Sequence, residues 1–422
     1  MHLAPTARQQ RLRAELRAYF RDLLPDGPVT DPVAQRTVLR RIGADGLLGL
    51  GWPTAYGGRG RGPGEQFVFF DEAYRAGAPV SMVTLNTVGP TLMKYGTPRQ
   101  KDFFLPRILK GELVFAIGYT EPEAGTDLAS LRTRAVRAAG AGDGAGAGAQ
   151  GGEGAGDGPE GAVAGPEGSV GGPEGPDWLI HGSKSFTSNA HQADWIWLAC
   201  RTDPDAPRHR GISIILVPTD APGFSWTPIE TVGGLMTTAT YYEGVRVPYG
   251  NLVGEENAGW GLITNQLNHE RVALAAIGMQ AEDAYEAALA HARRPDPETR
   301  ERPADRAWVR SRLAEAHARL AATRLLNWRL VGDVGAGTLS PGDASGVKFA
   351  GTESTVEVYR MCQEVVGDTA LIRAGSPGAY GDGELERMNR AAQINTFGGG
   401  VGEVQREIVA TMRLGMRKGR RR

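Results

Sequence analysis

The stretch LNHERVALA, residues 267–275, holds an acidic residue where a helix would be apolar. Helical spacing puts Glu270 three positions after Leu267 and four before Leu274, on the stripe that should face the core. A carboxylate there is partly removed from water, which raises its pKa and strengthens it as a general base. The structural alternative is an ordinary ion pair, because an arginine, Arg271, follows directly. The residues alone leave both roles open.

Two glycine-containing stretches have the composition of ligand cradles. YTEPEAGTD, residues 119–127, follows an expected strand and offers backbone amides and two hydroxyl groups. NTFGGGVGEVQREIVA, residues 395–410, runs three glycines into an expected helix start, where free N–H groups attract anions or carbonyl oxygens. Each stretch is also consistent with a plain turn or an ordinary helix start, so neither identifies a ligand.

Other chemical motifs are absent from the sequence. Its 7 histidines are scattered, and Cys200 and Cys362 are the only cysteines, so no metal site and no disulfide framework is indicated. Neither a G-x-S-x-G elbow nor a G-x-x-x-x-G-K-[ST] loop occurs. The glycines of GADGLLGLG precede Trp-Pro and do not open a helix after a strand, which argues against a dinucleotide-binding motif.

Composition and charge set the broad class. The 422 residues suggest about three domains, and a formal net charge of -1 gives no strong field for nucleic acid or a membrane surface. No apolar stretch reaches about 18 residues, and the N-terminal residues lack the apolar core of a signal peptide. A cytoplasmic location without a membrane span is therefore expected, with the basic C-terminal MRKGRRR as a solvated tail.

The expected elements divide the chain into three blocks. Residues 1–113 show helical periodicity interrupted by Gly- and Pro-rich turns. Residues 114–249 hold short runs rich in β-branched and aromatic residues, namely ELVFAIGYT, ADWIWLACRTD, GISIILVPT and TATYYEGVRVP. Residues 250–422 return to the helical period. The order helical, β, helical predicts an α+β fold with these three domains.

One segment fits none of these patterns. Residues 138–176 are mostly Gly, Ala, Glu and Pro, without lysine or arginine. Such a composition buries too little apolar surface to offset its ordering entropy, so a disordered surface loop is expected. The segment interrupts an expected hairpin between SLRTRAV and DWLIHGSKSFTSN. Because loop-closure entropy grows slowly with length, this insertion is thermodynamically tolerable.

Several stretches, taken together and in order, resemble the acyl-CoA dehydrogenase family over nearly the whole chain. YTEPEAGTDLASLRTRA resembles the family's T-E-P-x-A-G-S-D loop, and GSKSFTSNAHQADWIWLACRTD resembles its K-x-W-I-T-N strand. GPTLMKYGTPRQKDFFLPRILKGE, NLVGEENAGWG, QEVVGD and GEVQREIVA fall at the expected places. The resemblance implies an N-terminal helical domain, a middle β-barrel domain and a C-terminal four-helix bundle. FAD would lie between the β domain and the C-terminal helices.

The resemblance also implies residues that contact the flavin. Thr120 and the turn of Gly125 and Thr126 match flavin-contacting positions, and Thr126 also matches one that reaches toward the CoA arm. Phe186 stands where the family usually has a tryptophan over the flavin ring, and Ser188 where it has a threonine near N5. Both replacements keep the type of group, an aromatic ring and a hydroxyl.

Further cofactor positions lie in the last block. In QEVVGD, Gln363 and Gly367 match residues that touch the FAD of a neighbouring protomer, although Val366 replaces the family's first glycine. Val401 and Glu403 match positions on the cofactor side of the C-terminal helices, where Glu403 resembles a supporting residue and not the base. The family's R-x-x-F-G, which holds the adenine side across the interface, is not recognisable in this chain.

The resemblance also bears on the base. Most members place the catalytic glutamate in Y-E-G-T, which aligns with Gly398–Val401, so Gly399 occupies its place. The isovaleryl and long-chain types instead have it before an arginine, as in Glu270-Arg271. By this analogy Glu270 abstracts the substrate α-proton while hydride leaves the β-carbon for flavin N5. The Gly399 N–H, with a flavin ribityl hydroxyl, would hold the thioester oxygen.

Substrate and partner expectations follow from the same analogy. Substrate-side positions are matched by Thr126, Asn268, Arg271 and Gly400. The substrate would be an acyl-CoA or a carrier-bound acyl thioester, and the electron acceptor an electron-transfer flavoprotein. WIWLACRTDP, ITNQLNHERVALAA and INTFGGGVGEVQR resemble the actinobacterial steroid-side-chain dehydrogenases, so the assembly would be a homotetramer or an α2β2 heterotetramer. A flavin-dependent oxidase or monooxygenase of the same fold, and an FAD-poor partner subunit, stay open as alternatives.

Overall fold

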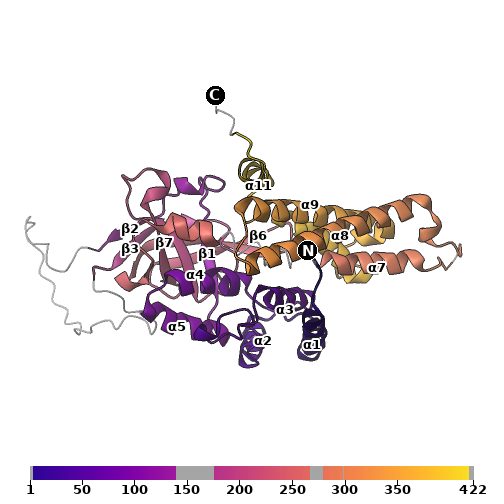
Figure 1. The fold of residues 1–422 in the computed structure, drawn as a ribbon, viewed down its shortest axis with the longest axis horizontal. Helices are drawn as coiled ribbons and strands as arrows, with labels where there is room; N and C mark the ends of the chain where they lie inside the picture. Colours follow the sequence, from indigo (N-terminus) through magenta and orange to yellow (C-terminus); the bar gives the residue numbers. More distant parts are fainter. Residues whose placement is uncertain (1–2, 139–174, 267–278, 298, 418–422) are drawn as a thin grey trace, which may run out of the picture.

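The computed structural model describes residues 3–138, 175–266, 279–297 and 299–417. Figure 1 shows three regions: N-terminal helices, a twisted sheet, and long C-terminal helices that extend away from the sheet. The predicted order of helical, β and helical segments, and with it the α+β fold class, is confirmed.

The N-terminal region is built from short helices with clear sequence signals. They are α1 (Ala7–Leu23), α2 (Pro32–Ala44), α3 (Pro63–Arg75), α4 (Gly89–Tyr95) and α5 (Pro98–Leu109). Capping boxes start α1 at Thr6 and α5 at Thr97, so each helix begins with a satisfied backbone N–H. Helix α3 is buried on nearly all sides, since it packs between α1 and α8.

The middle region is a mixed sheet. Its strands are β1 (Phe115–Gly118), β2 (Arg134–Arg137), β3 (Trp178–Lys184), β4 (Trp195–Arg201), β5 (Ile212–Pro218), β6 (Phe224–Glu230), β7 (Met236–Val247) and β8 (Leu252–Val253). The strand order is β6-β7-β3-β2-β4-β5-β8, and β1 pairs in parallel with β4. Strands β4 and β5 are buried along six consecutive residues each, which explains their continuous apolar runs.

Two predictions about the sheet have different outcomes. The predicted hairpin exists: β2 and β3 pair antiparallel from Arg137 opposite Trp178 to Arg134 opposite His181, on either side of the insertion. The predicted barrel is not closed, because the described strand order ends at β6 on one edge and β8 on the other. Closure depends on how distant strands twist and pair, which periodicity within one strand does not report.

The C-terminal region is a helical bundle. Its elements are α7 (Ala281–Arg293), α8 (Ala307–Gly335), α9 (Pro341–Val366), α10 (Glu384–Ala392) and α11 (Gly402–Ile408), preceded by helical residues 259–266. Helices α7, α8, α9 and α10 share one apolar core. Helix α11 packs on α9, and both lie at the upper side of the C-terminal region in Figure 1.

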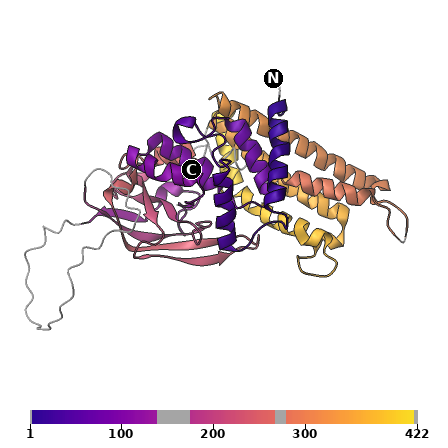
Figure 2. The same ribbon diagram turned by 90° about the horizontal axis from the view of Figure 1, so that it is seen from below.

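Separate cores hold the regions together. One core lies between the sheet and the bundle, and joins the N-terminal helices to one face of the sheet and to α8. In Figure 2 the first two helices, in indigo, lie where the sheet meets the C-terminal helices. The opposite face of the sheet has its own core. Within the described residues, no helix combines the length and apolar content needed to cross a bilayer.

Candidate active site

The loop that follows β1 is pinned to the end of β3. The Ser185 N–H donates to the Thr120 carbonyl oxygen at 2.8 Å, and Glu121 and Ala124 exchange two backbone hydrogen bonds at 3.1 Å. Thr120 is half-buried, whereas Gly125 and Thr126 are exposed. The loop therefore presents hydroxyl groups and backbone at the surface while its base is fixed to the sheet.

The segment after β3 places an aromatic ring and a hydroxyl beside that loop. Phe186 adopts φ 57°, a strained conformation for a bulky residue, and the residue is 62% exposed. The Thr187 N–H donates to the Thr238 carbonyl oxygen at 2.9 Å, which ties the segment to β7. The Ser188 hydroxyl lies 3.4 Å from the Thr237 hydroxyl. A held ring with an exposed face is suited to stack on a flat ligand.

A buried ion pair lies beneath both segments. The Lys184 ammonium contacts a Glu121 carboxylate oxygen at 2.8 Å, and their side chains are 0% and 8% exposed. Burial by itself would raise the pKa of Glu121, but the Lys184 charge and hydrogen bonds to the carboxylate outweigh burial and lower it. Burial lowers the pKa of Lys184, and Glu121 opposes this effect. Sequence reasoning did not single out this pair, since 63 residues separate its members.

The glycine-rich stretch near the C-terminus forms a turn before α11. Gly399 and Gly400 have φ of 66° and 102°, and a Cβ on Gly400 would lie 2.5 Å from the Gln405 amide nitrogen. The Gly400 carbonyl oxygen accepts from the Lys348 ammonium at 2.5 Å. The Gly398 N–H donates to Ile394, whereas the Gly399 N–H has no acceptor among the described residues. That N–H is therefore available to a ligand carbonyl.

The remaining predicted residues of α9 and α11 are distributed along the helices. Val401 is the N-cap of α11, and Glu403 lies exposed in its first turn. Gln363, near the end of α9, donates to the Ala370 carbonyl oxygen at 3.1 Å, and Gly367 caps the helix with φ 85°. Lys348, beside the glycine turn, precedes Gln363 by about 22 Å along the helix axis at 1.5 Å per residue. One chain does not bring Gln363 to the glycine turn.

The predicted base and its neighbours, Asn268, Glu270 and Arg271, lie outside the described residues. The described helical segment before them ends at Gln266, which is 1% exposed. The Tyr119 hydroxyl donates to the Gln266 amide oxygen and accepts from Trp197 Nε1 at 3.1 Å. The residue that precedes Thr120 is thus in contact with the segment that leads to Glu270.

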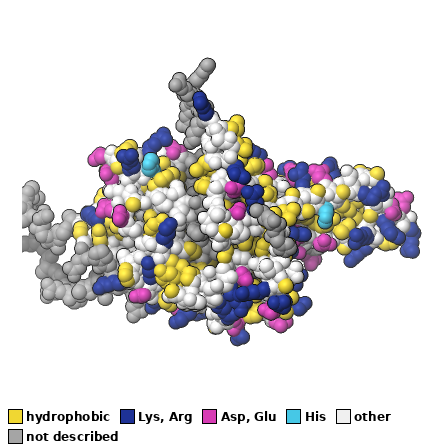
Figure 3. Space-filling model, viewed as in Figure 1, with side chains coloured by type: hydrophobic (Ala, Val, Ile, Leu, Met, Phe, Trp, Pro, Cys, Tyr) yellow, Lys and Arg dark blue, Asp and Glu magenta, His cyan; other side chains and the backbone are white. Residues whose placement is uncertain are grey.

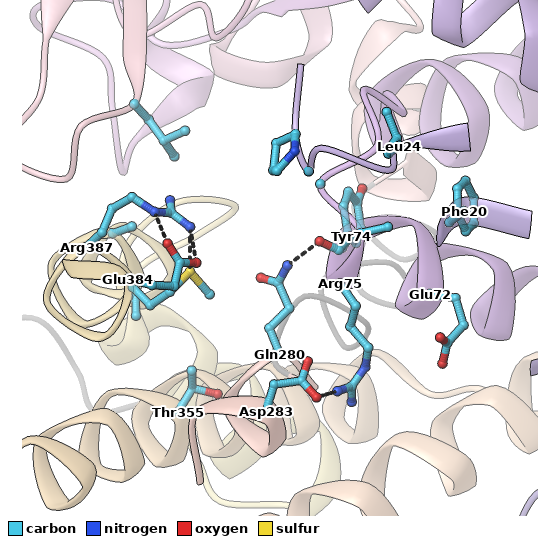
Figure 4. Close-up of a pocket in the computed structure, with 18 of the residues that line it drawn as sticks. Phe20, Leu24, Glu72, Tyr74, Arg75, Gln280, Asp283, Thr355, Glu384 and Arg387 are labelled. Carbon is cyan, nitrogen blue, oxygen red and sulfur yellow. Dashed lines mark hydrogen bonds and ion pairs between the residues drawn. The ribbon is translucent and has the colours of Figure 1, made fainter. Parts of the chain in front are cut away.

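A large cavity of about 1180 Å³ lies elsewhere, lined by α1, α3, α7, α9 and α10. In Figure 4, the Arg75 guanidinium contacts Asp283, Gln280 donates to the Tyr74 carbonyl oxygen, and Arg387 pairs with Glu384. None of the predicted site residues within the described part of the chain lines it. Figure 3 shows acidic and basic side chains intermingled over one face of the molecule, in keeping with the near-zero net charge.

Family models match three successive parts of the chain. The acyl-CoA dehydrogenase N-terminal domain matches residues 6–112, the middle domain residues 165–244 and the C-terminal domain residues 257–414. Acyl-CoA dehydrogenase FadE26 of Mycobacterium tuberculosis is 44% identical over 100% of both chains. FadE29 of the same organism is 43% identical over 98% of both.

Two solved structures are similar at full length. The Tcur3481-Tcur3483 steroid ACAD has a TM-score of 0.86 at 49% identity, covering 99% of this chain and 100% of that chain. The ChsE4-ChsE5 complex from Mycobacterium tuberculosis has a TM-score of 0.84 at 44% identity, with the same coverage. Each of these structures is named for two components.

Proposed function

Since the chain belongs to the acyl-CoA dehydrogenase family, we propose that Glu270 is the base that abstracts the α-proton of a bulky acyl-CoA thioester. The reaction is the FAD-dependent dehydrogenation of an acyl-CoA, an oxidation of a CH–CH bond. Members of the family bind FAD. When bound, FAD accepts the hydride that leaves the substrate β-carbon.

The surroundings of β1 and β3 fit such a cofactor. Thr120, Thr126 and Ser188 supply hydroxyl groups, and the exposed Phe186 ring supplies a stacking face. The proposed cofactor site depends on the hydrogen bond from the Ser185 N–H to the Thr120 carbonyl oxygen. This bond holds the loop after β1 and the segment after β3 side by side. Gly125, Val401 and Glu403 complete the proposed cofactor side, while Gln363 and Gly367 would reach the cofactor of a neighbouring protomer.

Glu270 is the proposed base, and the Gly399 N–H is the proposed group that stabilises the enolate. Glu270 takes the α-proton, which is acidic enough only if the developing enolate is stabilised. The Gly399 N–H, free of an acceptor among the described residues, donates to the thioester oxygen as negative charge develops. Asn268, Arg271, Thr126 and Gly400 lie on the proposed substrate side. An electron-transfer flavoprotein is the proposed acceptor of the electrons.

The substrate class is proposed from the relatives. The Tcur3481-Tcur3483 relative, at 49% identity, is named a steroid ACAD. We infer a fused-ring acyl chain, for which a wider pocket is needed than for a straight chain. The two-component names of both solved relatives support an assembly with a second, homologous chain.

Anaerobic mixing of the purified protein with acyl-CoA thioesters tests the proposal. Steroid side-chain thioesters should bleach the flavin absorbance, straight-chain thioesters should do so more slowly, and Glu270→Gln should slow bleaching by about 10²–10⁴-fold with FAD still bound. Glu15→Gln, an exposed helical glutamate, is the matched control and should behave as wild type. A yellow protein that no thioester reduces would overturn the proposed reaction, and full activity in Glu270→Gln would overturn the assigned base.

A further inference from the structure

The Glu121–Lys184 ion pair makes several hydrogen bonds to the backbone in addition to the contact between its two charges. One carboxylate oxygen of Glu121 accepts from the Thr133 N–H and from the Lys184 ammonium, both at 2.8 Å. The other oxygen accepts from the Arg132 N–H at 2.7 Å. Lys184 also donates to the Tyr119 carbonyl oxygen at 3.0 Å. Three separate chain segments therefore meet at one buried pair.

These bonds surround the residues proposed to hold the cofactor. Tyr119 precedes Thr120 and Glu121 follows it, so Lys184 is hydrogen-bonded to the chain on both sides of that threonine. Lys184 lies two residues before Phe186 and four before Ser188. The pair thus joins the base of the loop after β1 to the base of the segment after β3.

Stability alone is a weak reason for such an arrangement. Taking two charges out of water costs about as much as their attraction returns, and apolar replacements of similar volume are often neutral or stabilising. Directed hydrogen bonds from fixed backbone N–H groups, by contrast, set a unique geometry. Because the bonds converge on two ligand-facing segments, they fix the position of those segments relative to each other.

We propose that Glu121 and Lys184 are positioning residues of the flavin site, which hold the 120–126 loop and the 186–188 segment at the spacing that one FAD requires. This inference rests on the proposed function, since it presumes that FAD binds between these segments. The pair acts through Thr120, Phe186 and Ser188 and does not itself touch the substrate.

Three variants and one control test this role. The variants are Lys184→Met, Glu121→Gln and the double substitution, and the control is Asp71→Asn. Asp71 is also a fully buried ion-pair partner, bonded to Arg13 at 2.5 Å and Arg75 at 2.8 Å, but it lies on α3. Each protein is compared with wild type for the FAD dissociation constant, the visible circular dichroism of the bound flavin, and the melting temperature.

The expected pattern separates positioning from stability. All three variants should weaken FAD binding by at least about tenfold and change the flavin dichroism, whereas Asp71→Asn should lower the melting temperature and leave both flavin signals unchanged. The double variant leaves no unpaired buried charge, so it should regain part of the melting temperature lost in Lys184→Met without regaining FAD affinity. If Lys184→Met does not accumulate as folded protein, the FAD affinity and dichroism of Glu121→Gln test the inference. This variant is the milder one, because the carboxamide oxygen can still accept a hydrogen bond from a backbone N–H.

Two results would overturn the inference in distinguishable ways. Variants that bind FAD within twofold of wild type, with unchanged dichroism and a lowered melting temperature, would reduce the pair to a structural role. A wild-type protein that binds no FAD would overturn the proposed function and this inference with it.

Discussion

At the scale of single residues, burial separates the groups that build the site from those that face a ligand. Lys184 and Glu121 are buried and hydrogen-bonded to each other and to the backbone, so they support the site and do not face a substrate. Phe186 is exposed on a strained backbone, and the Gly399 N–H lacks an acceptor among the described residues. Groups of this second kind are the ones a ligand can engage without first displacing a partner.

The buried pair also predicts how stability depends on pH. In wild type the pKa of Glu121 is lowered, so its contribution is present above the ordinary carboxyl pKa of about 4.3 and is lost as pH falls through the lowered value. In Lys184→Met, burial is left to raise the pKa of Glu121. The free energy of unfolding should then fall by about 3–5 kcal/mol at neutral pH.

The difference in the free energy of unfolding between wild type and Lys184→Met should narrow as pH falls from 7.5 to 4.5. Protonation of Glu121 in the variant removes the cost of its unpaired charge, whereas the wild-type pair stays ionised over this range. Urea unfolding at pH 7.5, 6 and 4.5 measures the trend. Arg246→Met, which breaks an exposed pair with Asp177, is the control and should cost less than about 1 kcal/mol throughout. A difference that stays constant from pH 7.5 to 4.5 would contradict the coupling.

At the scale of elements, α5 shows how one side chain serves both a helix and the sheet. Gln100 is fully buried, and its amide oxygen accepts from the Thr97 N–H at 3.0 Å to complete the capping box. Its amide nitrogen donates to the carbonyl oxygens of Gly250 and Leu252, both at 2.8 Å. The start of α5 is thereby locked to the segment that contains β8.

Gln100→Leu should therefore destabilise far more than the loss of a cap. It leaves one N–H and two carbonyl groups without their partner, and each buried unsatisfied group costs about 1–3 kcal/mol. Thermal unfolding checks this, with Gln10→Leu on the exposed face of α1 as the matched control, expected within about 0.5 kcal/mol of wild type. Equal melting temperatures for the two variants would show that water replaces the lost bonds.

At the scale of the whole molecule, the N-terminal helices join the other two regions. Phe67 of α3 and Trp328 of α8 meet edge to face with ring centroids 5.3 Å apart, and both rings are buried. The same core includes Trp195 and Trp197 of β4. The relative placement of sheet and bundle, and so of any ligand between them, depends on this shared packing.

The position of Gln363 and Gly367 at the far end of α9 favours a site completed by another chain. We expect the protein expressed alone to contain less FAD per chain than the protein co-expressed with a homologous second chain, since cross-chain contacts are missing. Light scattering after size-exclusion chromatography, with the FAD-to-protein ratio, measures both mass and loading. A stable, fully FAD-loaded homotetramer would contradict the two-component assembly.

The sequence by itself determined the kinds of element and their order. The alternating and continuous apolar runs predicted β1, β4, β5 and β7, and the interrupted hairpin of β2 and β3 was predicted from its two flanks. These features follow from contiguous residues, because backbone preference and side-chain period are local properties. The family resemblance was confirmed as well. It rests on short contiguous motifs in a fixed order, which can also be read from the sequence without the tertiary structure.

Only the tertiary structure decided which groups meet. Strand β6 is mostly exposed and contains Pro228, so it lacks an apolar pattern and exists through its pairing with β7. The bond from Gln100 to Gly250 joins residues 150 positions apart, and the Glu121–Lys184 pair joins residues 63 positions apart. Whether the sheet closes depends on its two edge strands, β6 and β8. The predicted catalytic and binding roles, including that of Glu270 outside the described residues, stay predictions. Contacts over such separations depend on how whole elements pack, and no local preference in the chain specifies that packing.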